Sequence, residues 1–213
     1  MATPSAAAPV RSMKLFIGIA VVWFALAFWA GATGIVARNA DDPPLRIALA
    51  AGVPTLIGIG LLVFSGRVRA WAQGLDLSLL IYLQGWRMAG FSFLALYAQS
   101  LLPNDFSLAA GLGDLALAVT APFVAGYVAR RGRAAGAVFV TWTVLGILDF
   151  IVAITLGAIN DITAYTVLAD GTKEIPPMAE LPLSLIPTYF VPLLIIVHLL
   201  ALVRFRALDT LPG

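Results

Sequence analysis

The sequence predicts an all-α protein built as a bundle of six transmembrane helices. Of its 213 residues, 61% are hydrophobic and only 11% are charged, whereas soluble domains average about 25% charged residues. Apolar runs long enough to cross a bilayer recur along the chain. The polar segments between these runs are short. The length therefore suits one compact bundle without a separate soluble domain.

Composition also excludes several classes of protein. The chain has no cysteine, which rules out disulfides, thiolate metal sites and cysteine nucleophiles. The formal net charge of +2 is too small to indicate a nucleic-acid partner. Both lysines, Lys14 and Lys173, lie outside the apolar runs, and a single histidine cannot form a bis-histidine haem site. We therefore expect no cofactor, no metal and no nucleic acid, with the lipid bilayer as the main partner.

A turn separates the first two spans. Residues 1–13 are small or polar and predict a disordered cytoplasmic tail. Residues 14–36 form an apolar run that exceeds the core of a signal peptide, which is about 7–15 residues long. Residues 38–46 then contain two aspartates and a pair of prolines, which stop a helix. The second span, residues 45–64, holds a proline and several glycines that suit close helix contact.

Each of the next three spans contains a charged residue well inside its apolar run. They cover about residues 77–102, 106–128 and 136–159. Arg87 lies in the first of these spans, Asp114 in the second and Asp149 in the third. The first link between them is only three residues long and begins with a proline, whereas the second is rich in arginine.

The longest connection, residues 160–181, precedes the last span. Its middle contains an Asp-Gly pair between loosely alternating residues, which is a signal for a β-hairpin. We expect this connection to form a short extracytoplasmic cap. The sixth span, residues 182–205, contains two prolines and His198, and residues 207–213 form a second cytoplasmic tail.

The basic residues of the loops favour one orientation. On one side they are Arg11, Lys14, Arg67, Arg69, Arg130, Arg131, Arg133, Arg204 and Arg206. On the other side they are Arg38, Arg46 and Lys173. Cytoplasmic loops collect lysine and arginine, so both ends of the transmembrane domain (residues 14–206) are expected in the cytoplasm. Arginine far outnumbers lysine, which is typical of GC-rich bacterial genomes. The sequence thus predicts a multi-pass protein of the inner (plasma) membrane.

Arg87, Asp114 and Asp149 form the candidate site, which we call the Arg87 cluster. The two acids lie about eight and ten residues from the outer ends of their spans, or roughly 12 and 15 Å at the helical rise. A charged residue at mid-span costs roughly 2.5–3.5 kcal/mol on insertion scales. We therefore predict that the three side chains face inward, toward each other or water, and that Arg87 contacts at least one of Asp114 and Asp149 inside the bundle. If both acids are ionised, the cluster has one net negative charge, which a proton or a bound cation would balance.

Two further polar residues are candidates for the same site. Gln84 lies one turn before Arg87 on the same helix face and is predicted to join a ligand- or ion-binding site. His198, the only histidine, is a candidate proton relay toward the cytoplasm. The alternatives are a purely structural salt bridge for the cluster and a packing role for the histidine. The sequence leaves these alternatives open.

Residues 111–114 read Gly-Leu-Gly-Asp. This segment resembles the GxGD motif of presenilin-type and prepilin-peptidase-type intramembrane aspartyl proteases. The resemblance implies an acid–base pair in which Asp114 and Asp149 are catalytic. In those families, however, the partner aspartate precedes the motif, whereas Asp149 follows it. The presenilin-type Pro-Ala-Leu motif is also absent, and the resemblance covers only four residues.

The leading interpretation is a membrane protein that binds or moves a small solute, lipid or ion through the Arg87 cluster. One alternative is an intramembrane aspartyl hydrolase. Another is a non-catalytic structural or assembly subunit that presents a face of small residues. The candidates for that face are Gly52, Gly58 and Gly60. The enzyme class stays open with a preference for a non-enzyme, and homo-oligomer formation also stays open.

Overall fold

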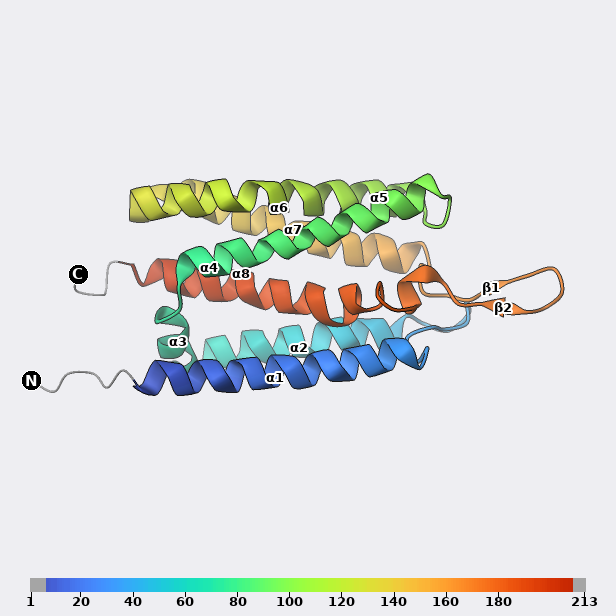
Figure 1. The fold of residues 1–213 in the computed structure, drawn as a ribbon, viewed down its shortest axis with the longest axis horizontal. Helices are drawn as coiled ribbons and strands as arrows, with labels where there is room; N and C mark the ends of the chain where they lie inside the picture. Colours follow the sequence, from blue (N-terminus) through green and yellow to red (C-terminus); the bar gives the residue numbers. More distant parts are fainter. Residues whose placement is uncertain (1–6, 209–213) are drawn as a thin grey trace, which may run out of the picture.

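The computed structural model describes residues 7–208 and shows an all-α helical bundle (Figure 1). The long helices are α1 (Ala7–Ala32), α2 (Leu45–Phe64), α6 (Asn104–Arg131), α7 (Gly136–Ile159) and α8 (Val191–Arg206). A further rod is composed of α4 (Leu77–Tyr82), the 3₁₀ stretch η1 (Leu83–Gly90) and α5 (Phe91–Ala98). The shorter elements are α3 (Gly66–Gln73), η2 (Gly132–Ala135), β1 (Thr166–Val167), β2 (Lys173–Glu174), η3 (Pro177–Ala179) and the π-helical turn η4 (Ile186–Phe190).

The six rods follow the six predicted spans, with α2 and α7 at the predicted boundaries. The rod that begins at Leu77 ends at Ala98 rather than residue 102, where Ser100 adopts a left-handed conformation with φ of 58°. The last rod begins at Ile186 rather than residue 182. Pro187 and Pro192 lack the amide hydrogen for regular α-helical bonding, so this rod opens with the π-helical turn η4.

One predicted tail and one predicted connection contain helix. Residues 7–13 were expected in a disordered tail but form the first turns of α1, where alanines favour helix. Residues 1–6 and 209–213 of the two predicted tails lie outside the described residues. The loop after α2 folds into α3, because the Ser65 side chain accepts a hydrogen bond from the Val68 amide and caps the helix.

Four helical runs in the described chain are long and apolar enough to cross a membrane: Leu45–Phe64, Leu77–Ala98, Asn104–Ile159 and Ile186–Arg206. The third run contains both α6 and α7, which turn back on each other through η2 (Figure 1). A shorter apolar stretch, Ile17–Ala32, lies in α1. Many large apolar side chains on the outside of the bundle are exposed, as expected for a surface that contacts lipid rather than water.

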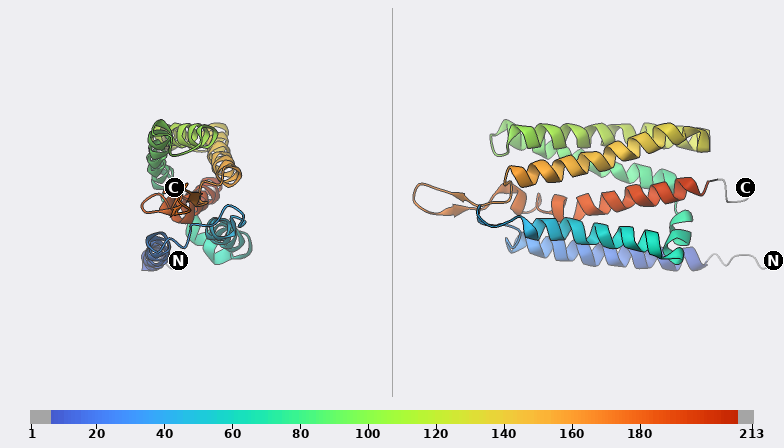
Figure 2. Two further views of the ribbon diagram at one scale, coloured as in Figure 1. Left: turned by 90° about the vertical axis from the view of Figure 1, so that its right-hand side faces the viewer. Right: turned by 180° about the vertical axis from the view of Figure 1, so that it is seen from behind.

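Helix α8 lies at the centre of the bundle. The end-on view in Figure 2 shows α1 and α2 on one side of α8, with the α4–α5 rod, α6 and α7 on the other. Contacts between α8 and the helices α2, α3, α4 and α7 agree with this arrangement. The largest buried cluster in the described chain joins α4, α6, α7 and α8 and includes Ile81, Ala121, Phe139 and Ala201. α8 therefore links the two groups of helices.

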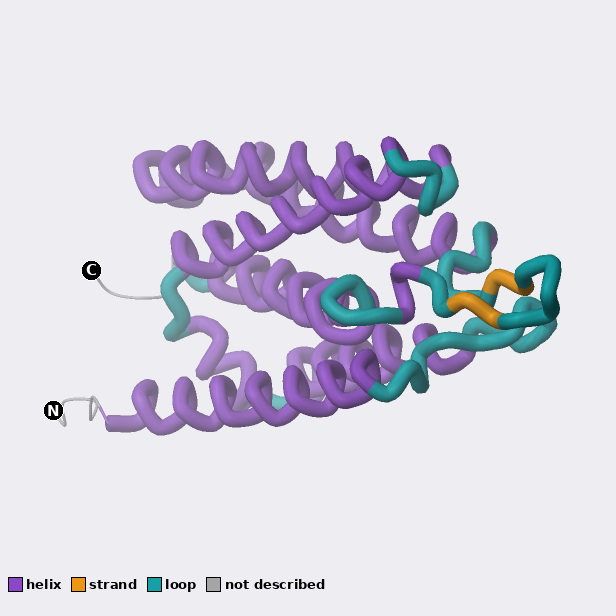
Figure 3. The backbone as a smooth tube through the Cα atoms, turned by 45° about the vertical axis from the view of Figure 1, so that its right-hand side comes forward, coloured by secondary structure: helices purple, strands orange, loops and turns teal. Residues whose placement is uncertain are grey.

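The predicted cap (residues 160–181) contains the hairpin that the Asp-Gly pair indicated. β1 and β2 pair antiparallel, with Thr166 opposite Glu174. Gly171 has a φ of 82°, which glycine adopts without steric cost. The hairpin projects from one end of the bundle, while α1 begins and α8 ends at the other (Figures 1 and 3).

Candidate functional site

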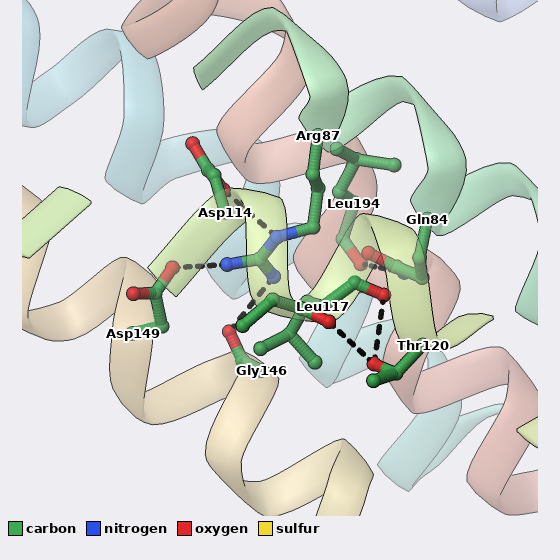
Figure 4. Close-up of polar contacts among 9 residues, drawn as sticks. Gln84, Arg87, Asp114, Leu117, Thr120, Gly146, Asp149 and Leu194 are labelled. Atoms are coloured by element: carbon green, nitrogen blue, oxygen red, sulfur yellow. Dashed lines mark hydrogen bonds and ion pairs between the residues drawn. The ribbon is translucent and has the colours of Figure 1, made fainter. Parts of the chain in front are cut away.

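Arg87 lies in η1, midway along the rod from Leu77 to Ala98, and is only 2% exposed. Its Nε donates to Asp114 Oδ1 of α6 at 2.8 Å, and its Nη1 donates to the Gly146 carbonyl of α7 at 3.0 Å. Its Nη2 pairs with Asp149 Oδ2 of α7. The guanidinium also lies 3.8 Å from the centroid of the Phe150 ring. One side chain therefore ties three rods together (Figure 4). A contact of Arg87 with at least one of the two acids was predicted, and the structure shows contacts with both.

Glycines make the space that these polar groups occupy. A Cβ built on Gly113 would lie 1.7 Å from Asp149 Oδ1, so the carboxylate packs directly on the α6 backbone. A Cβ on Gly90 would lie 2.4 Å from Asp114 Cβ and 2.9 Å from its Oδ2. The second glycine of the Gly-Leu-Gly-Asp segment thus admits the acid of the neighbouring helix. Tight packing explains this glycine without any catalytic role.

The two oxygens of Asp114 have different surroundings. Oδ1 accepts the hydrogen bond from Arg87, but no side chain or amide in the described part of the chain donates to Oδ2. In Figure 4 this second oxygen points away from the guanidinium. Asp114 also lines two cavities. A carboxylate oxygen with free acceptor capacity is therefore available to a bound group.

The first cavity extends from Asp114 toward the hairpin end of the bundle. It measures about 90 Å³ and lies among α2, α6, α7 and the segment before α8, with Phe93, Phe106 and Met178 in its wall. The second cavity measures about 100 Å³ and lies between η1 and the start of the last rod. Trp86 and Phe190 line it and stack on each other at 5.7 Å between centroids. Both cavities have mainly apolar walls. Asp114 contributes a carboxylate to each of them, with Thr163 as a further polar residue in the first cavity and Arg87 in the second.

Gln84 and His198 are buried near the cluster but do not bind it directly. Gln84 Nε2 donates to the Leu194 carbonyl at 3.1 Å and so ties η1 to α8. The His198 ring packs edge-on against Trp142 at 5.3 Å between centroids. Neither ring nitrogen of His198 has a hydrogen-bond partner among residues 7–208. The roles predicted for Gln84 in ligand binding and for His198 as a relay remain predictions.

Gly146 connects the histidine to the cluster. Its carbonyl accepts from Arg87, and a Cβ built on it would lie 2.5 Å from His198 Nε2. Sequence reasoning missed both Gly146 and Phe150 as neighbours of Arg87. Gly146 lies three residues before Asp149 on the same helix, and this spacing was an available signal. Phe150 directly follows Asp149, and adjacent residues on a helix do not share a face, so spacing gave no signal for it. Within the described residues no group of three or more histidine, aspartate or glutamate residues could hold a metal ion.

Residues 44–206 match the model of a family described as a domain of unknown function, DUF8737. The chain belongs to this family. No curated protein and no solved structure matches it.

The DUF8737 domain spans α2 to α8 and therefore includes Gln84, the Arg87 cluster and His198. Helix α1 precedes the matched region. All the residues that line the two cavities beside Asp114 belong to this domain. The candidate site is thus a feature of the matched domain of this chain, whereas α1 contributes nothing to its polar contacts.

Proposed function

We propose that this protein is a multi-pass protein of the inner membrane that binds a small cation with apolar substituents at Asp114. Oδ2 of Asp114 carries the proposal, because it accepts no hydrogen bond from the described chain and borders two apolar cavities. Arg87 holds the other oxygen of this carboxylate in place. Apolar cavities with a few placed polar groups are the usual form of small-molecule sites.

The charge of the cluster supports a cationic ligand. One guanidinium faces two carboxylates, and the described residues form no other ion pair with these three. With both acids ionised the cluster has a net charge of −1, and an uncompensated charge in the membrane interior is costly. A bound cation neutralises that charge, and a proton on one of the acids neutralises it when no cation is bound. Because the cavities approach Asp114 from two directions, the same site suits movement of the solute as well as binding.

The geometry favours binding over the hydrolase alternative. The Arg87 guanidinium gives a different nitrogen to each acid. An aspartyl dyad instead needs two carboxyl groups that share one proton, and a cation bound to both acids favours their ionised forms. The arrangement therefore suits a fixed anionic site.

A thermal-shift experiment on the purified protein tests the proposal. We expect tetramethylammonium or choline to raise the unfolding temperature, because a ligand stabilises the state that it binds. The neutral analogue 3,3-dimethylbutanol should not. Asp114→Asn should abolish the shift, whereas Asp41→Asn, which removes the same charge from an exposed loop residue, should keep it. Equal shifts with the neutral alcohol, or a full shift in Asp114→Asn, would contradict a cation site at Asp114 and favour the structural salt bridge.

We also propose that both chain ends face the cytoplasm and that the hairpin faces outward. The support is the excess of basic residues on the side of the chain ends. The chain lacks cysteine, so Thr172→Cys provides one thiol in the hairpin. An impermeant maleimide should label this thiol from outside intact cells. Labelling only after the cytoplasm is opened would reverse the orientation.

A further inference from the structure

Helix α1 is attached to the domain mainly at η4. Trp23 Nε1 donates a hydrogen bond to the Thr188 carbonyl at 3.2 Å. Pro192, four residues after Thr188, cannot supply the α-helical hydrogen bond to that carbonyl because it has no amide hydrogen. The Trp23 ring also packs edge-on against Tyr189 at 5.1 Å between centroids. α1 is thus attached to η4, whereas the part of α1 whose side chains the structure describes, residues 17–32, makes little contact with α2.

An open groove lies between α1 and α2. It encloses about 450 Å³, which falls within the range of about 300–1,000 Å³ typical of ligand pockets. Small side chains line it from both helices: Ala27 and Ala30 from α1, and Ala50 and Pro54 from α2. Facing small residues in membrane helices normally allow the backbones to approach closely. Here the helices stay apart and leave room for a flexible apolar chain.

Arg46 stands at the hairpin end of this groove. Its Nη1 donates to the carbonyls of Ile35 at 2.8 Å and Ala37 at 3.1 Å, which fixes the guanidinium beside the groove. Its Nε and Nη2 form no hydrogen bond with the described chain, and the side chain is exposed. Arg46, Ala50 and Pro54 follow one another at intervals of four and so share one face of α2.

The charges around Arg46 suit an anionic group. Arg46 lies in the first turn of α2, where the helix dipole adds positive potential. The charge of Arg46 acts on Asp42, the acid nearest to it in the sequence. The Asp42 carboxylate, however, already accepts hydrogen bonds from the amide and the side chain of Asn39. Arginine binds phosphate through two parallel N–H groups. The remaining guanidinium donors of Arg46 can make that contact.

We propose that the groove between α1 and α2 holds one acyl chain of an anionic phospholipid, with its phosphate bound by Arg46. The apolar length of the groove complements the acyl chain of the lipid, and the basic Arg46 at its end complements the anionic phosphate. The site does not use the Arg87 cluster. It lies partly on α1, so the lipid would connect this helix to the DUF8737 domain.

Lipid retention tests this proposal. The protein is reconstituted in nanodiscs of phosphatidylcholine with phosphatidylglycerol and then re-extracted in mild detergent. Native mass spectrometry counts the phosphatidylglycerol that each chain retains. We expect about one retained molecule per wild-type chain and about fivefold weaker retention for Arg46→Gln, the effect of one basic residue at an anionic membrane surface. Arg67→Gln removes the same charge at the other end of α2 and should retain lipid like the wild type.

A second variant tests the position of the acyl chain. Ala50→Leu fills the groove and should expel the lipid while leaving Arg46 in place. Equal retention by Arg46→Gln and Arg67→Gln would overturn the phosphate contact. Wild-type retention by Ala50→Leu would overturn the acyl position. If filling the groove changes the fraction of dimer and leaves lipid retention unchanged, a second copy of the chain occupies the groove and the proposal is wrong.

Discussion

Two buried arginines hold different parts of this molecule together, and they do so with different partners. Arg87 binds two carboxylates and a carbonyl from neighbouring rods inside the bundle. Arg38, which is 5% exposed, lies between α1 and α2 at the hairpin end. Its Nη1 donates to three backbone carbonyls of its own loop, those of Asn39, Ala40 and Asp42. Its Nη2 pairs with Asp161 after α7.

The difference between these arginines follows from their surroundings. Inside an apolar bundle the backbone carbonyls are mostly used by the helices, so a charge must find acids on other helices. In a loop the carbonyls are free, and an arginine can close the loop on itself. Arg38 also joins two connections, because its amide donates to the Thr163 carbonyl and its carbonyl accepts from the Tyr165 amide. Arg87 therefore fixes the bundle interior, whereas Arg38 fixes its outer end.

Removal of Arg87 should have the largest effect. Arg87→Ala leaves two carboxylates facing each other without a cation, and loss of one partner of a buried pair costs about 3–5 kcal/mol. The triple variant Arg87→Leu, Asp114→Asn, Asp149→Asn has no charge to compensate and should recover much of that loss. Chemical unfolding in detergent measures both. Equal stability of the single and triple variants would mean that the three charges are not coupled.

Removal of Arg38 should have a smaller and more local effect. Arg38→Ala loses hydrogen bonds from a charged donor, which contribute about 1.5–3 kcal/mol, but water can replace them at the exposed end of the bundle. We expect faster proteolysis in residues 160–181 with little change in the unfolding of the helices. The matched control is Arg67→Ala, an exposed arginine at the opposite end. If Arg38→Ala lowers global stability as much as Arg87→Ala, the two regions are not independent.

Acid should loosen the loop that Arg38 closes, and this effect should be the smallest of the three. Hydrogen bonds from the Asn39 side chain and amide, helped by the charges of Arg46 and Arg38, hold the pKa of Asp42 below its ordinary value of 3.8. Because the pKa of Asp42 is lower in the folded protein than in the unfolded chain, its ionised carboxylate stabilises the folded loop at pH values above the unfolded-state pKa. This stabilisation is lost as the pH falls through the folded-state pKa. Hydrogen exchange of the Asn39 amide should therefore show less protection below about pH 4 after correction for intrinsic rates. Asp42→Asn should remove that pH dependence, and an unchanged dependence would contradict the role of Asp42.

The sequence alone predicted six rods, the bounds of α2 and α7, and a contact of Arg87 with at least one acid. Apolar length and the cost of inserting a charge are properties of short segments, so they can be read residue by residue. That is why a contact of Arg87 with at least one of Asp114 and Asp149 could be predicted. The Asp-Gly pair is likewise a local signal, and it indicated the hairpin. A loop arginine such as Arg38 has no insertion cost, so nothing in the sequence marked it as buried.

Only the tertiary structure decided how the helix faces meet. Three features depend on helix rotation and on the side chains of several segments at once. They are the packing of Asp149 on Gly113, the free oxygen of Asp114 and the distance of α1 from α2. Gln84 illustrates the limit, since its place one turn from Arg87 gave no sign that its side chain donates to the Leu194 carbonyl of α8. Helical spacing gives the relative direction of two side chains on one helix, whereas the neighbouring helix decides what they touch.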